Sequence, residues 1–262
     1  MATYSFNVGE IDCMVISDGT VPINDVTKTF PNAPADGVLK AVAESGQDAQ
    51  KLRNYFNCLL ITTNGQRILV DTGSGDTSRA GLGELRDALI NEGITPDQID
   101  IVFITHFHGD HINGLVDDDG NMNYPNATYT TTADEWHGWM SDEALNAIGE
   151  ERAAGLKKVL LPIKDKLTLV GFDEEIAPGV TTIAAQGHTP GHVALLIESN
   201  GEQLMHLVDT AHRIFQLRNP TFSPHFDSQP DVSPQTREAL LKRVSDENLL
   251  TPCQLSASSS FA

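Results

Sequence analysis

The segment that most constrains the fold is FITHFHGDHINGL, residues 103–115, in which three histidines and one aspartate fall within six positions. The apolar run IDIVFI leads into it, so the polar part is expected at the carboxyl end of a β-strand. Imidazole and carboxylate groups are metal ligands, but one short loop presents them from one side only. The chain must therefore fold so that other strand ends bring further ligands to the same edge.

The order of the ligands within this segment indicates two cations. His106 and His108 are two residues apart, so in extended backbone their imidazoles project to the same side and can share one cation. Asp110 and His111 are offset by the turn at Gly109 and can hold a second cation beside the first. Two metal ions roughly 3.5–4 Å apart suit metal-assisted hydrolysis. The alternative is a polar loop that only forms hydrogen bonds, and the clustering of so rare a residue type favours metal binding.

Three further positions at predicted strand ends are candidates for the rest of the site. His188, in GHTPGH, follows an apolar strand and precedes a Thr-Pro-Gly turn, and it is the expected third imidazole. Asp209, at the end of QLMHLVD, is placed to bridge two metals. Asp71 is expected to orient the ring of a ligand histidine rather than to bind metal, and His192 to have an outer or capping role. Taken singly, each would more often be a cap or turn residue, and their shared position at strand ends favours a site.

Strands and helices alternate along the chain. Asn64-Gly65 and Asn200-Gly201 each separate two apolar runs, which predicts two-residue hairpin turns. Periodicity and capping signals predict three helices. They are residues 79–92 with Leu82, Leu85 and Leu89 on one face, a helix capped by Thr132 with Glu135 three residues on that carries Trp136 and Trp139, and a helix capped by Ser233 with Pro234 in its first turn.

Composition excludes several classes of function. The formal net charge is −19, from 36 acidic and 17 basic residues, which disfavours nucleic acid and anionic membrane surfaces as partners. Cys13, Cys58 and Cys253 are widely spaced without a CxxC pair, so neither a disulfide framework nor a thiolate zinc site is predicted. No targeting segment and no apolar run of roughly 18 residues occur, which predicts a soluble, cytoplasmic protein.

The motifs HFHGDH, with VDTG before it and GHTPGH and VDTAH after it, resemble the metallo-β-lactamase superfamily in content and order. The resemblance extends from about residue 55 to about residue 245. GHTPGHVALLI and the following DTAHRIFQLRNPTFSPHFDSQPDVSPQTR are most similar to the branch that contains methyl parathion hydrolase, with N-acyl-homoserine lactonases as near relatives. The implied fold is α/β, an αββα sandwich of the metallo-β-lactamase type. We expect a single domain over residues 1–262 with an atypical tail from about residue 250.

The resemblance also implies a dinuclear centre. His106, His108 and His188 would hold the first metal, Asp110 and His111 the second, and Asp209 would bridge them. The implied cofactor is two zinc ions per chain, with iron, manganese or cobalt as alternatives. The implied nucleophile is a hydroxide held between the metals, with Asp110, His111 and Asp209 as the catalytic residues around it and Asp71 just outside the ligands.

One part of the family pattern is missing. The family has a final histidine ligand for the second metal beyond the last helix, whereas this chain ends LLTPCQLSASSSFA, with Gln254 about where that histidine is expected. The second site is then weak, or it recruits Cys253 or a distant histidine such as His212 or His225, or the tail is not the ancestral one. For one choice of codons, a single-base frameshift from His-Phe-Pro-His would produce this tail, and a C-terminal truncation would explain why the chain ends so soon after its last helix.

The expected substrate is a small molecule with a neutral ester-like bond, namely a lactone, an aryl ester or a phosphotriester. Aromatic residues are candidates to line an apolar pocket for it, although each is as readily an ordinary core residue: Phe107, Trp136, Trp139, Phe215 and Phe222. The alternatives are a β-lactam hydrolase, a metal-binding protein of low activity and an iron-dependent relative. A homodimer is one assembly open to the chain.

Overall fold

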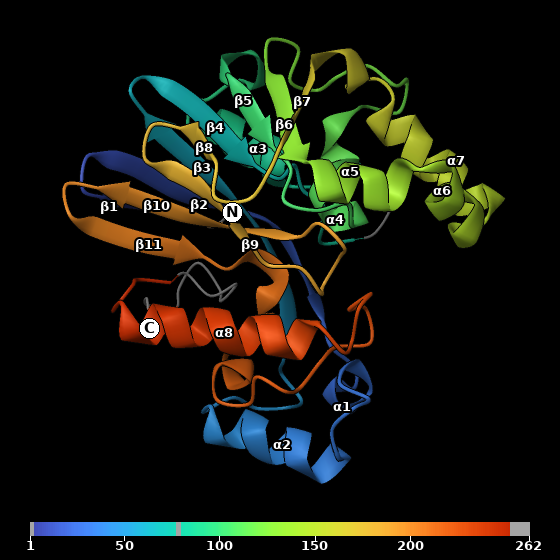
Figure 1. The fold of residues 1–262 in the computed structure, drawn as a ribbon, viewed down its shortest axis with the longest axis vertical. Coiled ribbons are helices and arrows are strands. Elements are labelled where there is room, and N and C mark those ends of the chain that lie inside the picture. The colour runs from blue at the N-terminus through green and yellow to red at the C-terminus, as the bar shows by residue number, and fades with distance from the viewer. Residues whose placement is uncertain (1–2, 77–79, 252–262) are drawn as a thin grey trace.

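Two β-sheets lie face to face in the computed structural model, which describes residues 3–76 and 80–251 (Figure 1). Within these residues the first sheet has seven strands in the order β1-β2-β3-β4-β5-β6-β7, and the second has four in the order β11-β10-β9-β8. Helices lie against the outer face of each sheet. The arrangement confirms the predicted α/β class and αββα sandwich.

The strands of the first sheet are β1 Thr3–Val8, β2 Ile11–Pro22, β3 Arg53–Thr63, β4 Gln66–Val70, β5 Ile101–Phe103, β6 Thr128–Thr132 and β7 Leu167–Val170. Those of the second sheet are β8 Glu175–Ala177, β9 Val180–Ala184, β10 Val193–Ser199 and β11 Glu202–His206. The first sheet is antiparallel from β1 to β4 and parallel from β4 to β7, whereas the second is antiparallel throughout.

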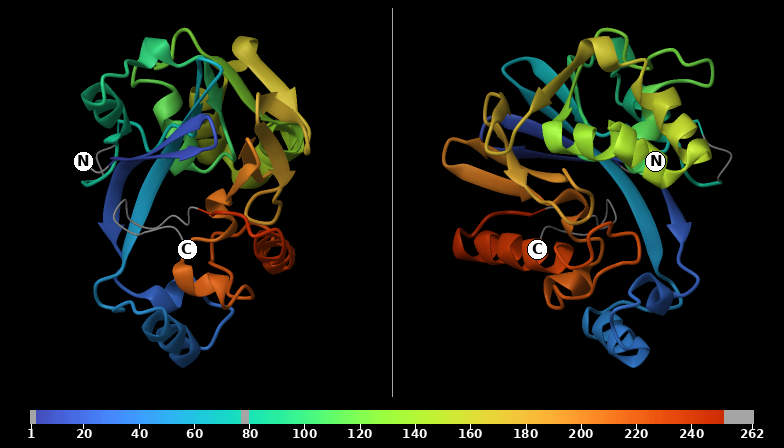
Figure 2. Two further views of the ribbon diagram at one scale, coloured as in Figure 1. Left: turned by 90° about the vertical axis from the view of Figure 1, so that its left-hand side faces the viewer. Right: turned by 45° about the vertical axis from the view of Figure 1, so that its right-hand side comes forward.

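The α-helices are α1 Val26–Thr29, α2 Ala35–Glu44, α3 Leu85–Asn91, α4 Gly109–Ile112, α5 Ala133–Met140, α6 Asp142–Ile148, α7 Glu150–Leu160 and α8 Ser233–Asp246. Short 3-10 turns are η1 Pro96–Gln98, η2 Asn113–Leu115, η3 Lys164–Lys166, η4 Val208–Thr210 and η5 Ile214–Leu217. Helices α3 to α7 lie on the side of the first sheet and α8 lies on the second, while α1 and α2 are at the end of the molecule away from α5 to α7 (Figures 1 and 2).

The sandwich has three apolar layers. Ile61, Val70 and Phe103 of the first sheet and Leu195 and Ile197 of the second are buried in one cluster between the sheets. A second cluster fills the space between the first sheet and its helices, and a third lies between the second sheet and α8. Each fully buried aliphatic side chain contributes about 1.5–3 kcal/mol, so these layers fix the two sheets relative to each other.

Strand direction brings the polar loops to one edge. Because β4 and β5 are parallel, the residues that follow them are neighbours, and Asp71 N donates to Phe103 O at 2.8 Å. In the second sheet, β11 ends at His206 opposite Leu195 near the start of β10. The β9–β10 loop and the segment after β11 therefore leave the second sheet together.

Both hairpin turns are present as predicted. Asn64 and Gly65 have φ values of 48° and 77°, and Asn200 and Gly201 have 52° and 80°. Positive φ at both central residues is the geometry of a type I′ turn, which Asn-Gly favours. The turns join β3 to β4 and β10 to β11.

The helix predicted over residues 79–92 begins at Leu85 instead. Residue 79, the first of the predicted range, lies outside the described residues. Gly81 and Gly83 have φ values of 87° and 81°, which an α-helix does not contain. Leu82, between them, is therefore outside the helix.

The other two predicted helices are present with altered ends. Thr132 caps α5, since its side chain accepts from Glu135 N, but the Glu135 carboxylate bonds to two distant loops instead. Ser141 then caps a separate helix, α6. Ser233 is the first residue of α8 rather than its cap, and its hydroxyl donates to Asp227.

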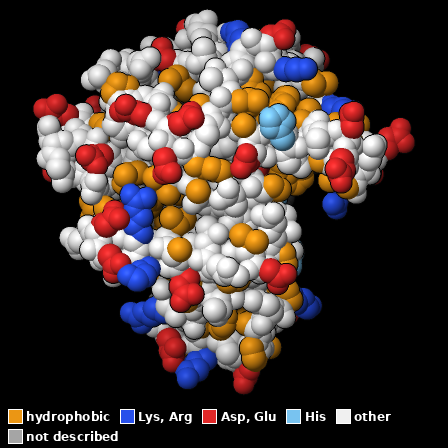
Figure 3. Space-filling view, viewed as in Figure 1, with side chains coloured by type: hydrophobic (Ala, Val, Ile, Leu, Met, Phe, Trp, Pro, Cys, Tyr) orange, Lys and Arg blue, Asp and Glu red, His pale blue; other side chains and the backbone are white. Residues whose placement is uncertain are grey.

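Acidic side chains are spread over the face of the molecule shown in Figure 3, with apolar side chains between them. Cys13 and Cys58 are buried free thiols, and burial raises the pKa of Cys13 to about 12. Within residues 3–76 and 80–251 we find no helix whose length and apolarity suffice to cross a bilayer.

Candidate metal centre

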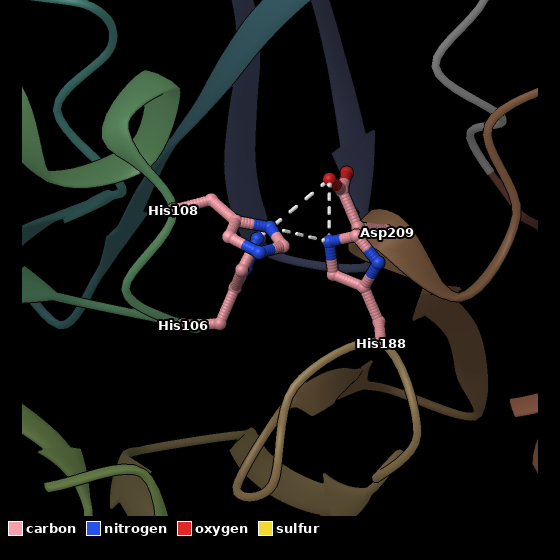
Figure 4. A group of neighbouring side chains, drawn as sticks. All are labelled: His106, His108, His188 and Asp209. Carbon is pink, nitrogen blue, oxygen red and sulfur yellow. Dashed lines mark hydrogen bonds and ion pairs between the residues drawn. The ribbon is translucent and has the colours of Figure 1, made fainter. Parts of the chain in front are cut away.

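The six predicted ligands lie on segments from both sheets that meet at this edge. They are His106 and His108 after β5, Asp110 and His111 in α4, His188 in the β9–β10 loop, and Asp209 in η4 after β11. Figure 4 shows one group of them, with ligands from the two sheets facing one another. The structure thus brings all six positions together, and their role as ligands stays a prediction.

His106, His108, His188 and Asp209 form the first set, which offers atoms that all lie within 4.8 Å of one another. His188 Nε2 is 2.8 Å from His108 Nδ1 and 3.2 Å from Asp209 Oδ2. His106 Nε2 is 3.7 Å from Asp209 Oδ2 and is buried without a hydrogen bond within the described chain. A buried polar atom without a partner is costly, and a cation at this point would satisfy it. These donors therefore fit a metal.

Asp110, His111 and Asp209 form the second set, also within 4.8 Å. His111 Nε2 is 3.4 Å from Asp209 Oδ2 and 3.7 Å from Asp110 Oδ2. Asp209 belongs to both sets, which is the position that a bridging ligand requires. Three protein ligands with an open position are typical of catalytic zinc sites.

Asp71 lies outside both sets and holds a ligand in place. Its Oδ2 is 2.8 Å from His111 Nδ1, and the backbone N–H and hydroxyl of Thr105 both donate to the same carboxylate. The φ of Asp71 is 63°, a conformation that costs a non-glycine residue about 1–3 kcal/mol. The hydrogen bonds offset this strain and turn Nε2 of His111 toward Asp209.

Asp227 is a supporting residue that no sequence pattern predicted. Its Oδ1 is 2.9 Å from His188 Nδ1, while its Oδ2 accepts from Ser233 Oγ at 2.5 Å and from Arg237 Nη2 at 3.1 Å. The buried Arg237 also donates to three backbone carbonyl oxygens. Asp227 lies in a segment without helical or strand periodicity, so no local pattern indicated this contact.

His192 supports the centre from behind. Its Nδ1 is 2.9 Å from Ala185 O, and its Nε2 accepts from the backbone N–H of Asp209 at 3.2 Å. Both ring nitrogens are occupied by the backbone, so His192 fixes the start of η4 and is not part of either ligand set.

The alternatives for the missing histidine have different outcomes. Gln254 and Cys253 lie outside the described residues. His225 lines a neighbouring cavity. His212 lies at the centre, with Nε2 3.2 Å from Asp209 Oδ2, but it belongs to neither of the ligand sets formed by the described residues.

The pKa values of the clustered groups diverge because their neighbours differ. Burial, with a contribution from neighbouring imidazoles, lowers the pKa of His108 to about 2 and that of His106 well below its usual range. Burial also disfavours the charged form of His188, but hydrogen bonds to Asp209 and Asp227 raise its pKa to about 9. Burial opposes ionisation of Asp209 too, yet nearby histidines hold its pKa well below its usual range. Neutral imidazoles and an ionised carboxylate are the forms that bind metal, so His106, His108 and Asp209 are already in that form at neutral pH, whereas His188 must lose a proton when a metal binds.

Two cavities meet at the centre. The first, of about 440 Å³, is lined by His108, Asp110, His188, Asp209, His212 and Arg213 among others. The second, of about 670 Å³, shares His108, Gly109, Asn113 and Phe226 with the first. Its remaining wall is largely apolar, with Ile112, Ile148, Leu156 and Val159.

The aromatic residues proposed for an apolar pocket separate into two groups. Phe107 and Trp139 line the second cavity, and Trp136 packs edge to face against Phe107 with ring centroids 6.2 Å apart. Phe215 and Phe222 instead pack in the apolar cluster of α1 and α2 and line neither of these two cavities, as the alternative of an ordinary core residue predicted.

Comparison with known proteins gives concordant matches. The family described as the Metallo-beta-lactamase superfamily matches residues 55–253. An N-acyl homoserine lactonase of Bacillus sp is 27% identical over 197 residues, which are 67% of this chain and 72% of the lactonase. The solved structure of AidC, described as a dizinc quorum-quenching lactonase, has a TM-score of 0.87 at 23% identity and covers 97% of this chain and 90% of its own. The hydrolase AbOPH has a TM-score of 0.86 at 23% identity, covering 97% and 89%. The structural likenesses concern the fold.

Proposed function

The chain belongs to the metallo-beta-lactamase superfamily, in its lactonase-like branch, and from this premise we propose that it is a metal-dependent hydrolase of neutral ester-like bonds. The observation that carries the proposal is the pair of ligand sets that share Asp209 on the wall of a cavity. Lactones are the leading substrate class, because the alignment with the lactonase relative covers 67% of this chain. Aryl esters and phosphotriesters follow.

The described residues hold places for two metal ions, which we propose to be zinc. His106, His108 and His188 would bind the first and Asp110 and His111 the second, with Asp209 between them. Bound zinc supplies Lewis acidity and lowers the pKa of water to about 7, so hydroxide is available at neutral pH. Because Asp110, His111 and Asp209 already number three, the second site does not need a ligand from the tail.

The residues of the chain provide orientation and selectivity. Asp209 lies between His111 of the second set and His188 of the first, and its position thereby sets where the reacting bond must lie. The first cavity has a mixed lining, and the second, with Phe107 and Trp139, is largely apolar. This pair of cavities fits a substrate that has a polar reacting group and an apolar acyl or aryl arm.

The electrostatics disfavour polyanionic substrates. Arg213 lines the first cavity, and its guanidinium is held by Arg53 O and the Asn54 side chain. With the net charge of −19, this arrangement favours an uncharged substrate. The single domain, the cytoplasmic location and the homodimer stay predictions from the sequence.

Metal analysis combined with substrate assays tests the proposal. We expect about two metal ions per chain, together with turnover of an acyl-homoserine lactone, an aryl ester or paraoxon that a chelator removes and zinc restores. Nitrocefin serves as the probe for a β-lactam hydrolase. Turnover that survives complete metal removal, or metal-loaded protein that hydrolyses none of the three substrates, would contradict the proposal.

A further inference from the structure

Glu135 is a buried carboxylate near the metal centre that none of the ligand sets uses. It lies in the first turn of α5 and is 0% exposed. Its Oε1 accepts from Phe107 N at 2.8 Å, and its Oε2 accepts from Thr189 Oγ1 at 2.7 Å and from Gly191 N at 2.8 Å. Both oxygens are therefore committed to two loops that are far apart in the sequence.

Those loops are the ones that carry the three imidazoles of the first set. Phe107 stands between His106 and His108, and Thr189 directly follows His188. One loop leaves the first sheet after β5, and the other joins β9 to β10 of the second sheet. The Glu135 carboxylate thus connects the ligand loop of the first sheet to the ligand loop of the second.

Close packing shows that the second loop sits directly on α5. A Cβ added to Gly191 would lie 1.9 Å from Glu135 N, and one added to Gly138 would lie 2.9 Å from Pro190 Cβ. The Thr132 hydroxyl adds a further bond by donating to Gly191 O at 2.7 Å. The N-terminal turn of α5 therefore acts as a seat for the loop.

The chemistry of the contacts requires a carboxylate. A carboxylate only accepts, which matches three converging donors, whereas a glutamine would turn an NH₂ group toward at least one N–H. Burial raises the pKa of Glu135, and its hydrogen bonds oppose that shift. A buried anion is costly unless a positive charge lies nearby, and a cation held by His106, His108 and His188 would supply one.

We propose that Glu135 is a positioning residue that holds the loops of residues 105–111 and 187–192 at the separation required to bind the first metal. The inference rests on the proposed metal role of His106, His108 and His188, but on no particular substrate. The position of Glu135 in the first turn of α5 suggested a role in helix capping, and the inference assigns it a role in holding the two loops instead.

Glu135→Gln tests this without a change in side-chain size. Zinc affinity is measured by chelator competition, and the ligand geometry by the visible spectrum of the Co²⁺ form. Loss of a partner outside the ligands typically weakens metal binding about 10–100-fold, and we expect that range here. Tyr129→Phe is the control, since it removes one buried hydrogen bond, to Tyr124 O, in β6, the strand that leads into α5. We expect the control to keep wild-type zinc affinity and Co²⁺ spectrum.

Thr189 provides a second, milder test in case Glu135→Gln does not fold. Thr189→Val removes one donor and is expected to weaken zinc binding, whereas Thr189→Ser keeps the hydroxyl and should restore it. In a double-mutant cycle the two changes should be less than additive, because both break the same contact.

Wild-type zinc affinity and Co²⁺ spectrum in folded Glu135→Gln would overturn the inference, as would equal affinities of Thr189→Val and Thr189→Ser. These readouts are independent of turnover. A protein that hydrolyses none of the substrates but loses zinc affinity on Glu135→Gln would refute the proposed function and support this inference.

Discussion

The two ligand sets share Asp209 but are held in different ways. In the first set His106, His188 and Asp209 are buried and His108 is partly buried. Two of its rings are held from behind: His106 Nδ1 lies 3.0 Å from Thr105 Oγ1, and His188 Nδ1 lies 2.9 Å from Asp227 Oδ1. Glu135 adds backbone contacts to both loops. The first set is therefore fixed before any metal arrives.

The second set is fixed on one side only. His111 is held by Asp71, but the Asp110 side chain is 35% exposed and accepts no hydrogen bond within residues 3–76 and 80–251. Asp110 also lines the first cavity. Within the second set, Asp110 is thus the ligand most open to a substrate or solvent molecule.

The difference in support between the two sets assigns them different tasks, namely tight metal binding in the first set and exchange of water and substrate in the second. Preorganised ligands bind tightly because little ordering remains to be done on binding, and their outer partners maintain that order. An open position is needed where water and substrate must exchange. We therefore expect the first set to bind metal more tightly than the second.

The largest effect is expected from His108→Ala. This change removes a ligand of the first set from the wall shared by both cavities. Zinc affinity at the first set should fall by more than about 100-fold, beyond the usual cost of losing an outer partner, and metal-dependent turnover should disappear. Chelator competition and the substrate assays measure both. Retained metal-dependent turnover in this variant would show that His108 is not a required metal ligand.

Asp110→Asn addresses the open set. The amide keeps the size of the carboxylate but loses its charge, so occupancy should fall from about two metals per chain toward one while the affinity of the first set is kept. Metal titration followed by atomic emission distinguishes the two sites. Asp118→Asn makes the same change on an exposed side chain and should leave occupancy at two. Equal weakening of both sites would show that the sets are not independent.

The parts of this centre that could be predicted are those with a local signal. An apolar run followed by a polar motif marks a strand end, and this placed His106, His108, His188 and Asp209 at the edge where the structure has them. The sandwich followed from the family resemblance, and the hairpins from Asn-Gly pairs.

The contacts that were missed depend on segments brought together by the fold. Asp227 meets His188 across 39 residues, and Glu135 meets Thr189 across 54. Glu135 even carries a conflicting local signal, since its spacing from Thr132 indicated a capping box. A tertiary carboxylate with three donors outweighs a single cap bond, and nothing in the periodicity of either segment reports it.

Asp227→Asn tests whether outer support accounts for the tight set. Asparagine can still accept from His188, but it removes the charge that faces the buried Arg237. We expect zinc binding at the first set to weaken about 10–100-fold. The free energy of unfolding should fall by up to about 3–5 kcal/mol, because a buried charge loses its partner. Asp231→Asn, on an exposed residue of the same segment, is the control. Unchanged zinc affinity in Asp227→Asn would break the link between buried support and tight binding.

The smallest effect is expected one bond further out, at Ser233. Its hydroxyl donates to Asp227 Oδ2 and accepts from Arg237 Nη2 at 2.7 Å, so it touches the support but not the ligand. Ser233→Ala should cost about 1.5–3 kcal/mol of unfolding free energy, the usual value for a hydrogen bond to a charged group. Asp227 keeps its contacts with His188 and Arg237, so zinc affinity should fall less than in Asp227→Asn. Denaturant unfolding and chelator competition on the same protein give both values. If Ser233→Ala weakened zinc binding as much as Asp227→Asn, the tight set would depend on the position of α8 rather than on the carboxylate that orients His188.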